Sequence, residues 1–196
     1  MNCSNHIVKK SLKRGGLYIK VYHFSEEPDI EEFEPRVINQ ADESAKVWAI
    51  DDFHAPHYYF PRECPRVCVW PKEDTTLQDR MAFFGMSTVN RMIAIETGWY
   101  ERVRNGHIYR YTFDGDDFVL YEPNAGYYIS TQTVKPIKVE KIEDLIMAIL
   151  KEGIELRVTP SLMLLKDRIL KSTVNFSMIR MRNAVQVAFV PRWSDV

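Results

Sequence analysis

The sequence predicts a single α+β domain, in which short strands form a mixed sheet accompanied by about three helices. Its 196 residues suffice for one well-packed core and are few for two. Hydrophobic residues make up 45% and charged residues 27%, as is typical of globular proteins. The strand patterns are short and irregularly spaced among helices, which argues against a regular parallel α/β sheet. We expect the domain to occupy residues 17–196, after a flexible, basic lead-in at 1–16.

The first part of this domain is expected to contain three strands. Alternating apolar residues predict a strand over 17–24, and short apolar runs predict strands over 47–50 and 67–70. Between the last two, an aspartate pair at 51–52 is expected to cap one or two helical turns, which Pro61 ends. The aromatic residues of this region therefore lie close to strand ends.

The clearest predicted helix runs from a cap at Ser87 or Thr88 to Arg104, where an Asn-Gly pair supplies a stop signal. Its apolar positions recur with the helical period, and Glu96 falls in the middle of the apolar stripe. A carboxylate that faces a core must be paired or neutralised. We expect Glu96 to pair with an arginine, for which the candidates are Arg157, Arg180 and Arg182.

The rest of the chain is expected to contain further short strands and two more helices. Strands are predicted over 107–113, 127–132 and 138–140, with a turn at the DGDD stretch. Helices are predicted over 143–151 and 161–173, with the strand IELRV between them. Two strand-like segments, MIRMRNA and VQVAFV, complete the chain.

Composition and motifs argue against several classes of function. A net charge of −1 lacks the basic excess that favours binding to a phosphate backbone, so nucleic acid is not expected as a partner. No apolar run approaches the roughly 18 residues of a membrane span, and the N-terminus lacks a signal-peptide pattern, so we expect a cytoplasmic protein. Three cysteines are too few for a disulfide framework. Glycine-rich phosphate loops, nucleophile elbows and H-E-x-x-H helices are also missing from the sequence.

Two segments near the N-terminus are the strongest candidates for a functional site. They are LYIKVYHFSEEPDIEEFEPR at 17–36 and VWAIDDFHAPHYYFPRECPRV at 47–67. Each joins a short strand to a polar stretch rich in histidine and aromatic residues, and functional side chains are best placed where a rigid strand meets a loop. The candidate residues are His23, Trp48, Tyr58 and Tyr59.

These segments, together with GYYISTQTVKPIKV, IELRVTPSL and FSMIRMRNA, resemble an uncharacterised bacterial family, a domain of unknown function. The resemblance covers nearly the whole chain after Leu17. It implies no assigned activity, because the family is named by sequence alone.

More distantly, the chain resembles the ADP-ribosyltransferase fold, notably its rifampin-modifying branch, over residues 17–141. YHFS at 22–25 is similar to the YHG-type motif of that fold's first strand. Trp48 and Tyr59, with Tyr58 as the alternative second aromatic residue, reproduce the eleven-residue step of the transferases' tyrosine pair. The segments HIYRYTF, FVLYEP and YYISTQTVKPIKV also look like central strands of that branch.

This resemblance implies that NAD or a related nucleotide is the substrate, that ADP-ribose is transferred and that no cofactor is tightly bound. His23 would hold ribose hydroxyls and the aromatic residues would stack on nicotinamide. Positive charge develops on the ribose, so the site also needs a carboxylate. No residue stands unambiguously at that position; Glu122 is nearest in the aligned order, Asp117 is close to it, and Glu155 lies on a later strand.

Each candidate also has a structural interpretation. A histidine at a strand end can simply hold neighbouring groups by hydrogen bonds, and the aromatic residues can belong to the core. Arg180 and Arg182 could hold a pyrophosphate or lie on a solvated face of a strand. The protein would then be a non-catalytic ligand-binding or interaction domain of the same fold.

A second alternative is a structural zinc site. His54, His57, Cys64 and Cys68 are residue types that zinc accepts, although their spacing matches no standard zinc motif. Cys68 begins an apolar strand, where a free cysteine also serves as a small hydrophobic residue.

Overall fold

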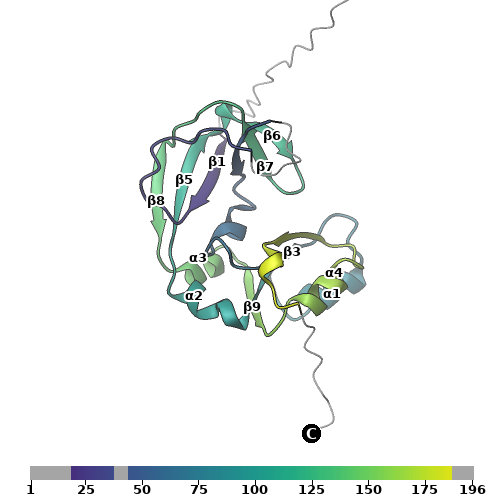
Figure 1. Ribbon diagram of the computed structural model, residues 1–196. Coiled ribbons are helices and arrows are strands. Elements are labelled where there is room, and N and C mark those ends of the chain that lie inside the picture. The colour runs from purple at the N-terminus through teal and green to yellow at the C-terminus, as the bar shows by residue number, and fades with distance from the viewer. Residues whose placement is uncertain (1–18, 38–43, 187–196) are drawn as a thin grey trace, which may run out of the picture.

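The computed structural model describes residues 19–37 and 44–186, in which the strands form two separate sheets (Figure 1). The first sheet has the strand order β6-β7-β2-β1-β5-β8, and the second has the order β10-β3-β4-β9. Helices accompany the second sheet, so the α+β class is confirmed. The expected single sheet is wrong, because the strands divide into two sheets, although one hydrophobic cluster contains residues of both.

The first sheet is antiparallel throughout, and its longest pairing joins β1 (Lys20–Ser25) to β5 (Ile108–Asp114). Every β1 residue has a β5 partner, from Lys20 opposite Asp114 to Ser25 opposite Tyr109. The remaining strands are β2 (Val47–Ile50), β6 (Val119–Glu122), β7 (Tyr127–Ser130) and β8 (Lys138–Ile142). Each pairs with its sheet neighbour in antiparallel orientation.

The second sheet is mixed and lies between two layers of helices. Its strands are β3 (Arg66–Trp70), β4 (Met92–Glu96), β9 (Glu155–Thr159) and β10 (Asn175–Ile179), and β4 pairs with β9 in parallel. On one face pack α1 (Leu77–Phe84) and α4 (Met163–Ile169), which lie together in Figure 1. On the other face pack α2 (Tyr100–Arg104) and α3 (Leu145–Lys151). Because both faces are covered, every residue of β3 and β4 is buried.

Four short 3₁₀ turns complete the described elements: η1 (Ala55–Tyr58), η2 (Thr97–Trp99), η3 (Gly115–Asp117) and η4 (Met181–Asn183). The turn expected after the 51–52 aspartate pair is thus confirmed as η1. Among the helices of the described residues, none combines the length and the apolar character needed to cross a bilayer.

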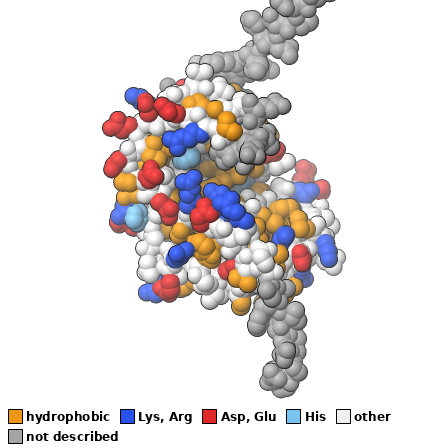
Figure 2. Space-filling view, viewed as in Figure 1, with side chains coloured by type: hydrophobic (Ala, Val, Ile, Leu, Met, Phe, Trp, Pro, Cys, Tyr) orange, Lys and Arg blue, Asp and Glu red, His pale blue; other side chains and the backbone are white. Residues whose placement is uncertain are grey.

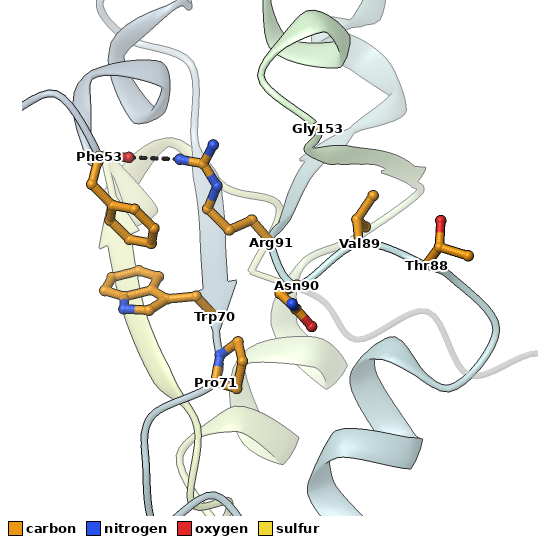
Figure 3. Close-up of a pocket in the computed structure, with 8 residues that line it drawn as sticks. All are labelled: Phe53, Trp70, Pro71, Thr88, Val89, Asn90, Arg91 and Gly153. Atoms are coloured by element: carbon orange, nitrogen blue, oxygen red, sulfur yellow. Dashed lines mark hydrogen bonds between the residues drawn. The ribbon is translucent and has the colours of Figure 1, made fainter.

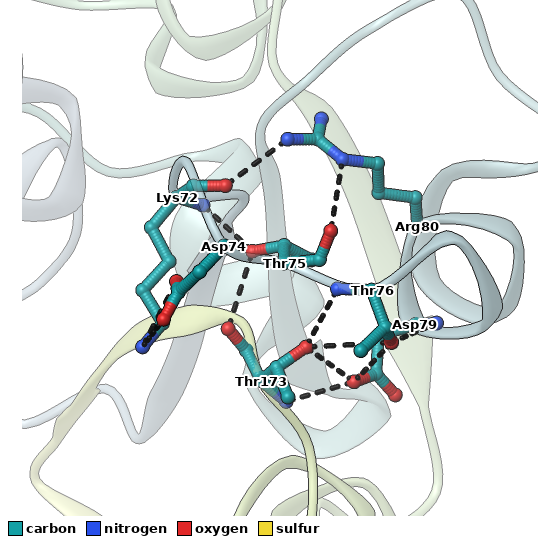
Figure 4. A network of polar contacts seen from close by, with 7 residues as sticks. All are labelled: Lys72, Asp74, Thr75, Thr76, Asp79, Arg80 and Thr173. Atoms are coloured by element: carbon teal, nitrogen blue, oxygen red, sulfur yellow. Dashed lines mark hydrogen bonds and ion pairs between the residues drawn. The ribbon is translucent and has the colours of Figure 1, made fainter.

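A polar network fastens the start of α1 to the segment before β10 (Figure 4). Thr76 caps α1 by accepting a hydrogen bond from the Asp79 backbone N–H. The Asp79 carboxylate in turn accepts bonds from the Thr173 hydroxyl, at 2.6 Å, and from the Thr173 backbone N–H, at 2.8 Å. Those bonds lower the pKa of Asp79, so its carboxylate stays ionised near neutral pH.

Most predicted strands and the helix at 143–151 are confirmed to within three residues at each end, and the helix predicted over 161–173 is shorter, as α4. The strand expected at MIRMRNA is wrong beyond 179, because 181–183 form η4. The helix predicted over 87–104 is wrong in its first half, because residues 92–96 form β4 and helical structure begins only at 97. An apolar, β-branched run that is buried on all sides carries no clear period, so its environment decides its conformation. Residues 1–16 and most of VQVAFV lie outside the described residues.

Candidate functional site

His23, near the end of β1, presents a defined hydrogen-bonding group. Its Nδ1 atom lies 2.8 Å from the backbone carbonyl oxygen of Trp48 on β2. Because a carbonyl oxygen only accepts hydrogen bonds, Nδ1 carries the proton in the neutral ring and Nε2 keeps its lone pair. The Phe33 ring packs against the imidazole with the ring centroids 4.8 Å apart. His23 therefore offers Nε2 as an acceptor.

Two exposed arginines lie close enough to His23 to influence its protonation. Burial lowers the pKa of His23, the hydrogen bond to Trp48 opposes this shift, and the positive charges of Arg62 and Arg36 lower the pKa further. Neither arginine forms an ion pair with a carboxylate of the described residues. On the face that Figure 2 presents, basic side chains gather near the middle, with acidic side chains among them. The site thus combines a neutral acceptor with two cationic donors.

A cleft with a volume of about 830 Å³ is lined by segments that neighbour His23 and Arg62 in the sequence, although neither of these residues lines it. Its walls come from the end of β1, the loop after η1 and the η2–α2 segment, and include Glu26, Pro61, Glu63, Trp99 and Arg102. Arg62 stands between two lining residues, and Glu26 follows His23 by three positions. The Arg102 guanidinium lies over the Trp99 ring, 5.0 Å from its centroid. A volume of this size suits a nucleotide-sized ligand.

Glu63, on the wall of this cleft, is held by donors from η4 and the residue before it. Its carboxylate accepts hydrogen bonds from Asn183 at 2.9 Å and Arg182 at 3.0 Å, and it lies 3.4 Å from Arg180. The bonds from Asn183 and Arg182 lower the pKa of Glu63, so it is ionised near neutral pH. Arg180 has a left-handed backbone, with φ 55°, and also donates to the carbonyl oxygen of Arg62. These contacts fix the loop that carries Arg62.

The predicted aromatic residues Tyr58 and Tyr59 lie on the opposite side of the first sheet from His23. Successive residues of a strand point to opposite faces. His23 accordingly packs against Phe33 on one side, whereas Phe24 packs against Tyr58 and Tyr59 on the other. Tyr59 is only 3% exposed, and burial raises the pKa of both tyrosines. Both belong to the packed layer beneath the sheet.

Trp48 shares that second side. Its ring packs edge-to-face against Tyr127, whose hydroxyl lies 2.8 Å from the Tyr58 hydroxyl. The Trp48 indole N–H is buried and has no hydrogen-bond partner in the described part of the chain. The three predicted aromatic side chains therefore lie on the same side of the sheet. His23 contacts this group through its hydrogen bond to the backbone carbonyl of Trp48.

The predicted acidic residues are distributed around the molecule. Glu122 lies on the exposed edge strand β6, three strand spacings or about 14 Å from β1. Asp117 lies in η3, beyond the end of β1 opposite to His23. Glu155 belongs to the second sheet and bonds to Arg157. The remaining predicted residue, Arg182, does lie beside the cleft through its contact with Glu63.

Glu96 is buried, as predicted, but the expected arginine partner is wrong. Its carboxylate accepts hydrogen bonds from the backbone N–H groups of Leu162, at 3.2 Å, and Val185, at 3.0 Å. These two N–H groups, at the start of α4 and after η4, have no partner within a helix or strand, and the Glu96 carboxylate supplies the acceptor that they need. Glu96 is thus a structural residue at the end of β4.

The four possible zinc ligands do not form a metal cluster. No group of three or more His, Cys, Asp or Glu side chains is arranged to hold a metal within residues 19–37 and 44–186. Burial raises the pKa of Cys64 and of Cys68 to about 12, so both are thiols. His54 bonds instead to Asp51, with 2.7 Å between Nδ1 and Oδ1.

Sequence reasoning missed Arg36, Arg62, Glu63 and Asn183. Each stands in a segment that had been singled out: EFEPR, PRECPR or RMRNA. The available signal was the repeated combination of arginine with glutamate or asparagine next to a proline or a turn. It could not show that these distant segments meet.

The model of a Family of unknown function (DUF6886) matches residues 22–184. The chain belongs to this family. The matched range contains His23, Arg36, Arg62, Glu63 and Asn183, so the whole candidate site lies within the DUF6886 domain. The comparisons found no match among curated proteins and none among solved structures.

Proposed function

We propose that the protein binds NAD or a related nucleotide at the His23 site. One observation supports this most strongly: a neutral histidine acceptor lies near Arg36 and Arg62, which have no carboxylate partner in the described residues. A ribose hydroxyl can donate to Nε2, and guanidinium groups are suited to phosphate oxygens. The cleft lined by Pro61 and Glu63, the two sequence neighbours of Arg62, has room for the rest of such a ligand.

The proposed reaction is transfer of ADP-ribose, as the distant resemblance to ADP-ribosyltransferases implies. The bond between nicotinamide and ribose breaks, nicotinamide leaves as a neutral molecule, and an acceptor hydroxyl or water attacks the ribose carbon and loses a proton. Groups that bind the ribose and phosphates hold the reacting bond in place during this step.

A second candidate is a non-catalytic ligand-binding domain of the same fold. The placement of Glu122 and Glu155 favours it, because neither carboxylate lies near His23. A protein of this kind would bind the nucleotide without releasing nicotinamide.

Calorimetric titration of NAD tests the binding proposal. We expect saturable binding to the wild type and an affinity about tenfold lower for His23→Ala and for Arg62→Ala, because each loses a hydrogen bond or a charge. Arg168→Ala, an exposed arginine on α4, serves as the control and should bind normally. Wild-type protein that gives no binding heat would refute the proposal.

Chromatography of the same mixtures separates the two candidates. Nicotinamide released by the wild type and lost in His23→Ala supports the enzyme. Binding without release supports the non-catalytic domain.

A further inference from the structure

A second cleft, with a volume of about 460 Å³, lies where the loop after β2, the end of β3 and the approach to β4 meet (Figure 3). Its walls include Phe53, Trp70, Pro71, Asn90 and Arg91, and Gly153 closes it from the turn between α3 and β9. These residues come from distant parts of the sequence, so the tertiary fold creates the cleft. It shares no lining residue with the cleft of Trp99 and Arg102.

One wall of this cleft is aromatic and rigidly supported. The rings of Phe53 and Trp70 meet edge-to-face, with centroids 6.0 Å apart. Trp70 is buried against the imidazoles of His54 and His57, at centroid distances of 5.1 and 5.2 Å. Phe53, in contrast, is 43% exposed. An exposed ring on a fixed support offers a flat apolar surface to a ligand ring.

The charge of the cleft is supplied by Arg91. Its Nη1 donates to the carbonyl oxygen of Phe53 at 2.8 Å, and its Nη2 donates to the carbonyl oxygen of Glu152 at 2.7 Å. The guanidinium also lies 4.7 Å from the centroid of the Phe53 ring. Both hydrogen bonds go to neutral carbonyls, and no lining residue is acidic. A fixed positive charge therefore faces an aromatic wall without a carboxylate from the lining to neutralise it.

We infer that this cleft binds a small planar aromatic anion, such as an aromatic carboxylate. The ring of the ligand packs against Phe53 and the edge of Trp70. A guanidinium carries five N–H hydrogens, so the two bonds to carbonyls leave others for the carboxylate. The volume of the cleft suits a ligand of one or two fused rings.

Titration with 2-naphthoate, followed by calorimetry and by the NMR signal of the Trp70 indole N–H, tests this inference. We expect saturable binding that shifts the Trp70 signal, which is assigned with Trp70→Phe. Two ligand controls separate the contributions of charge and ring: neutral 2-naphthamide and non-aromatic cyclohexanecarboxylate should each bind about tenfold more weakly.

Two variants test the residues. Arg91→Gln removes the charge, and Phe53→Leu removes the ring while leaving the Arg91 contacts to the backbone in place. Each should weaken 2-naphthoate binding about tenfold. Arg168→Gln is the matched control and should bind like the wild type. Equal affinity for 2-naphthamide, normal affinity in Phe53→Leu, or no saturation up to the solubility limit of the ligand would each overturn the inference.

Discussion

Arg66 illustrates how a single charged residue can be part of a protein core. It is 2% exposed, and its guanidinium donates to the carbonyl oxygens of His57 and Cys64. The rings of Tyr58 and Phe60 lie 5.3 and 5.1 Å from it. No carboxylate of the described residues pairs with it, so carbonyl dipoles and ring faces replace a counter-ion. Arg66 thereby joins η1 to β3.

Replacing Arg66 tests this role. We expect Arg66→Ala to lower the free energy of unfolding by about 2–4 kcal/mol, because it leaves a cavity and two unpaired carbonyls. Arg66→Met should cost less, since it keeps most of the volume and removes the desolvated charge. Urea denaturation measures both, with the exposed Arg168→Ala as the control. A Met variant as unstable as the Ala variant would show that the hydrogen bonds and charge of Arg66 stabilise the core more than its volume does.

At the scale of elements, β4 shows why the local sequence pattern did not predict the correct secondary structure of residues 92–96. Residues 92–96 fit a helical stripe, yet they form a strand because β3 and β9 pair with both of its edges. Its last residue, Glu96, then binds backbone N–H groups of Leu162 and Val185. One carboxylate thus connects β4, the start of α4 and the residues after η4.

Glu96→Ala should therefore destabilise the protein by about 2–3 kcal/mol, because it leaves buried backbone donors unsatisfied. Glu96→Gln should have a smaller effect, since the amide oxygen can still accept one bond. Thermal unfolding of both variants, compared with the exposed control Glu73→Ala, measures the effect. An unchanged melting temperature in Glu96→Ala would contradict this structural role.

Considered as a whole, the molecule concentrates basic groups where the loop after β2 meets the second sheet. His57 is 3% exposed there. Burial lowers its pKa well below 6.5, and the charges of His54, Arg66 and Arg91 lower it further. His57 is therefore neutral in the folded protein, whereas in the unfolded chain it takes up a proton near its ordinary pKa.

This shift predicts an acid-sensitive stability. The folded pKa is below the unfolded one, so the unfolded state binds more protons below about pH 6.5 and the free energy of unfolding falls there. The slope is at most about 1.4 kcal/mol per pH unit for this residue. Urea denaturation between neutral pH and about pH 5.5 avoids most carboxylate titration. His57→Gln should reduce the slope, leaving the part due to His23, whose pKa is also lowered, and the exposed His107→Gln should not reduce it; a slope that His57→Gln leaves unchanged would contradict the assignment.

Sequence reasoning identified much of the fold but only part of the site. The α+β class, η1 and the helix at 143–151 follow from local signals: strand alternation, a capping aspartate and a stop at glycine. His23 lies near the end of β1, and Arg182 contacts Glu63 on the wall of the cleft, but their part in binding a ligand stays a prediction. Trp48 and Tyr59 were assigned to the same site, but strand alternation and sheet register put their side chains on the other face from His23.

The sequence by itself determined most of the segments that become strands and turns, because these depend on neighbours a few residues away. Only the tertiary structure decided that β4 is a strand between β3 and β9, that Glu96 binds backbone instead of arginine, and that Glu63 meets Asn183. It also created the cleft of Phe53, Trp70 and Arg91. The physical reason is the same for all four: each depends on contacts between residues far apart in the chain, and hydrophobicity and period along one segment do not encode such contacts.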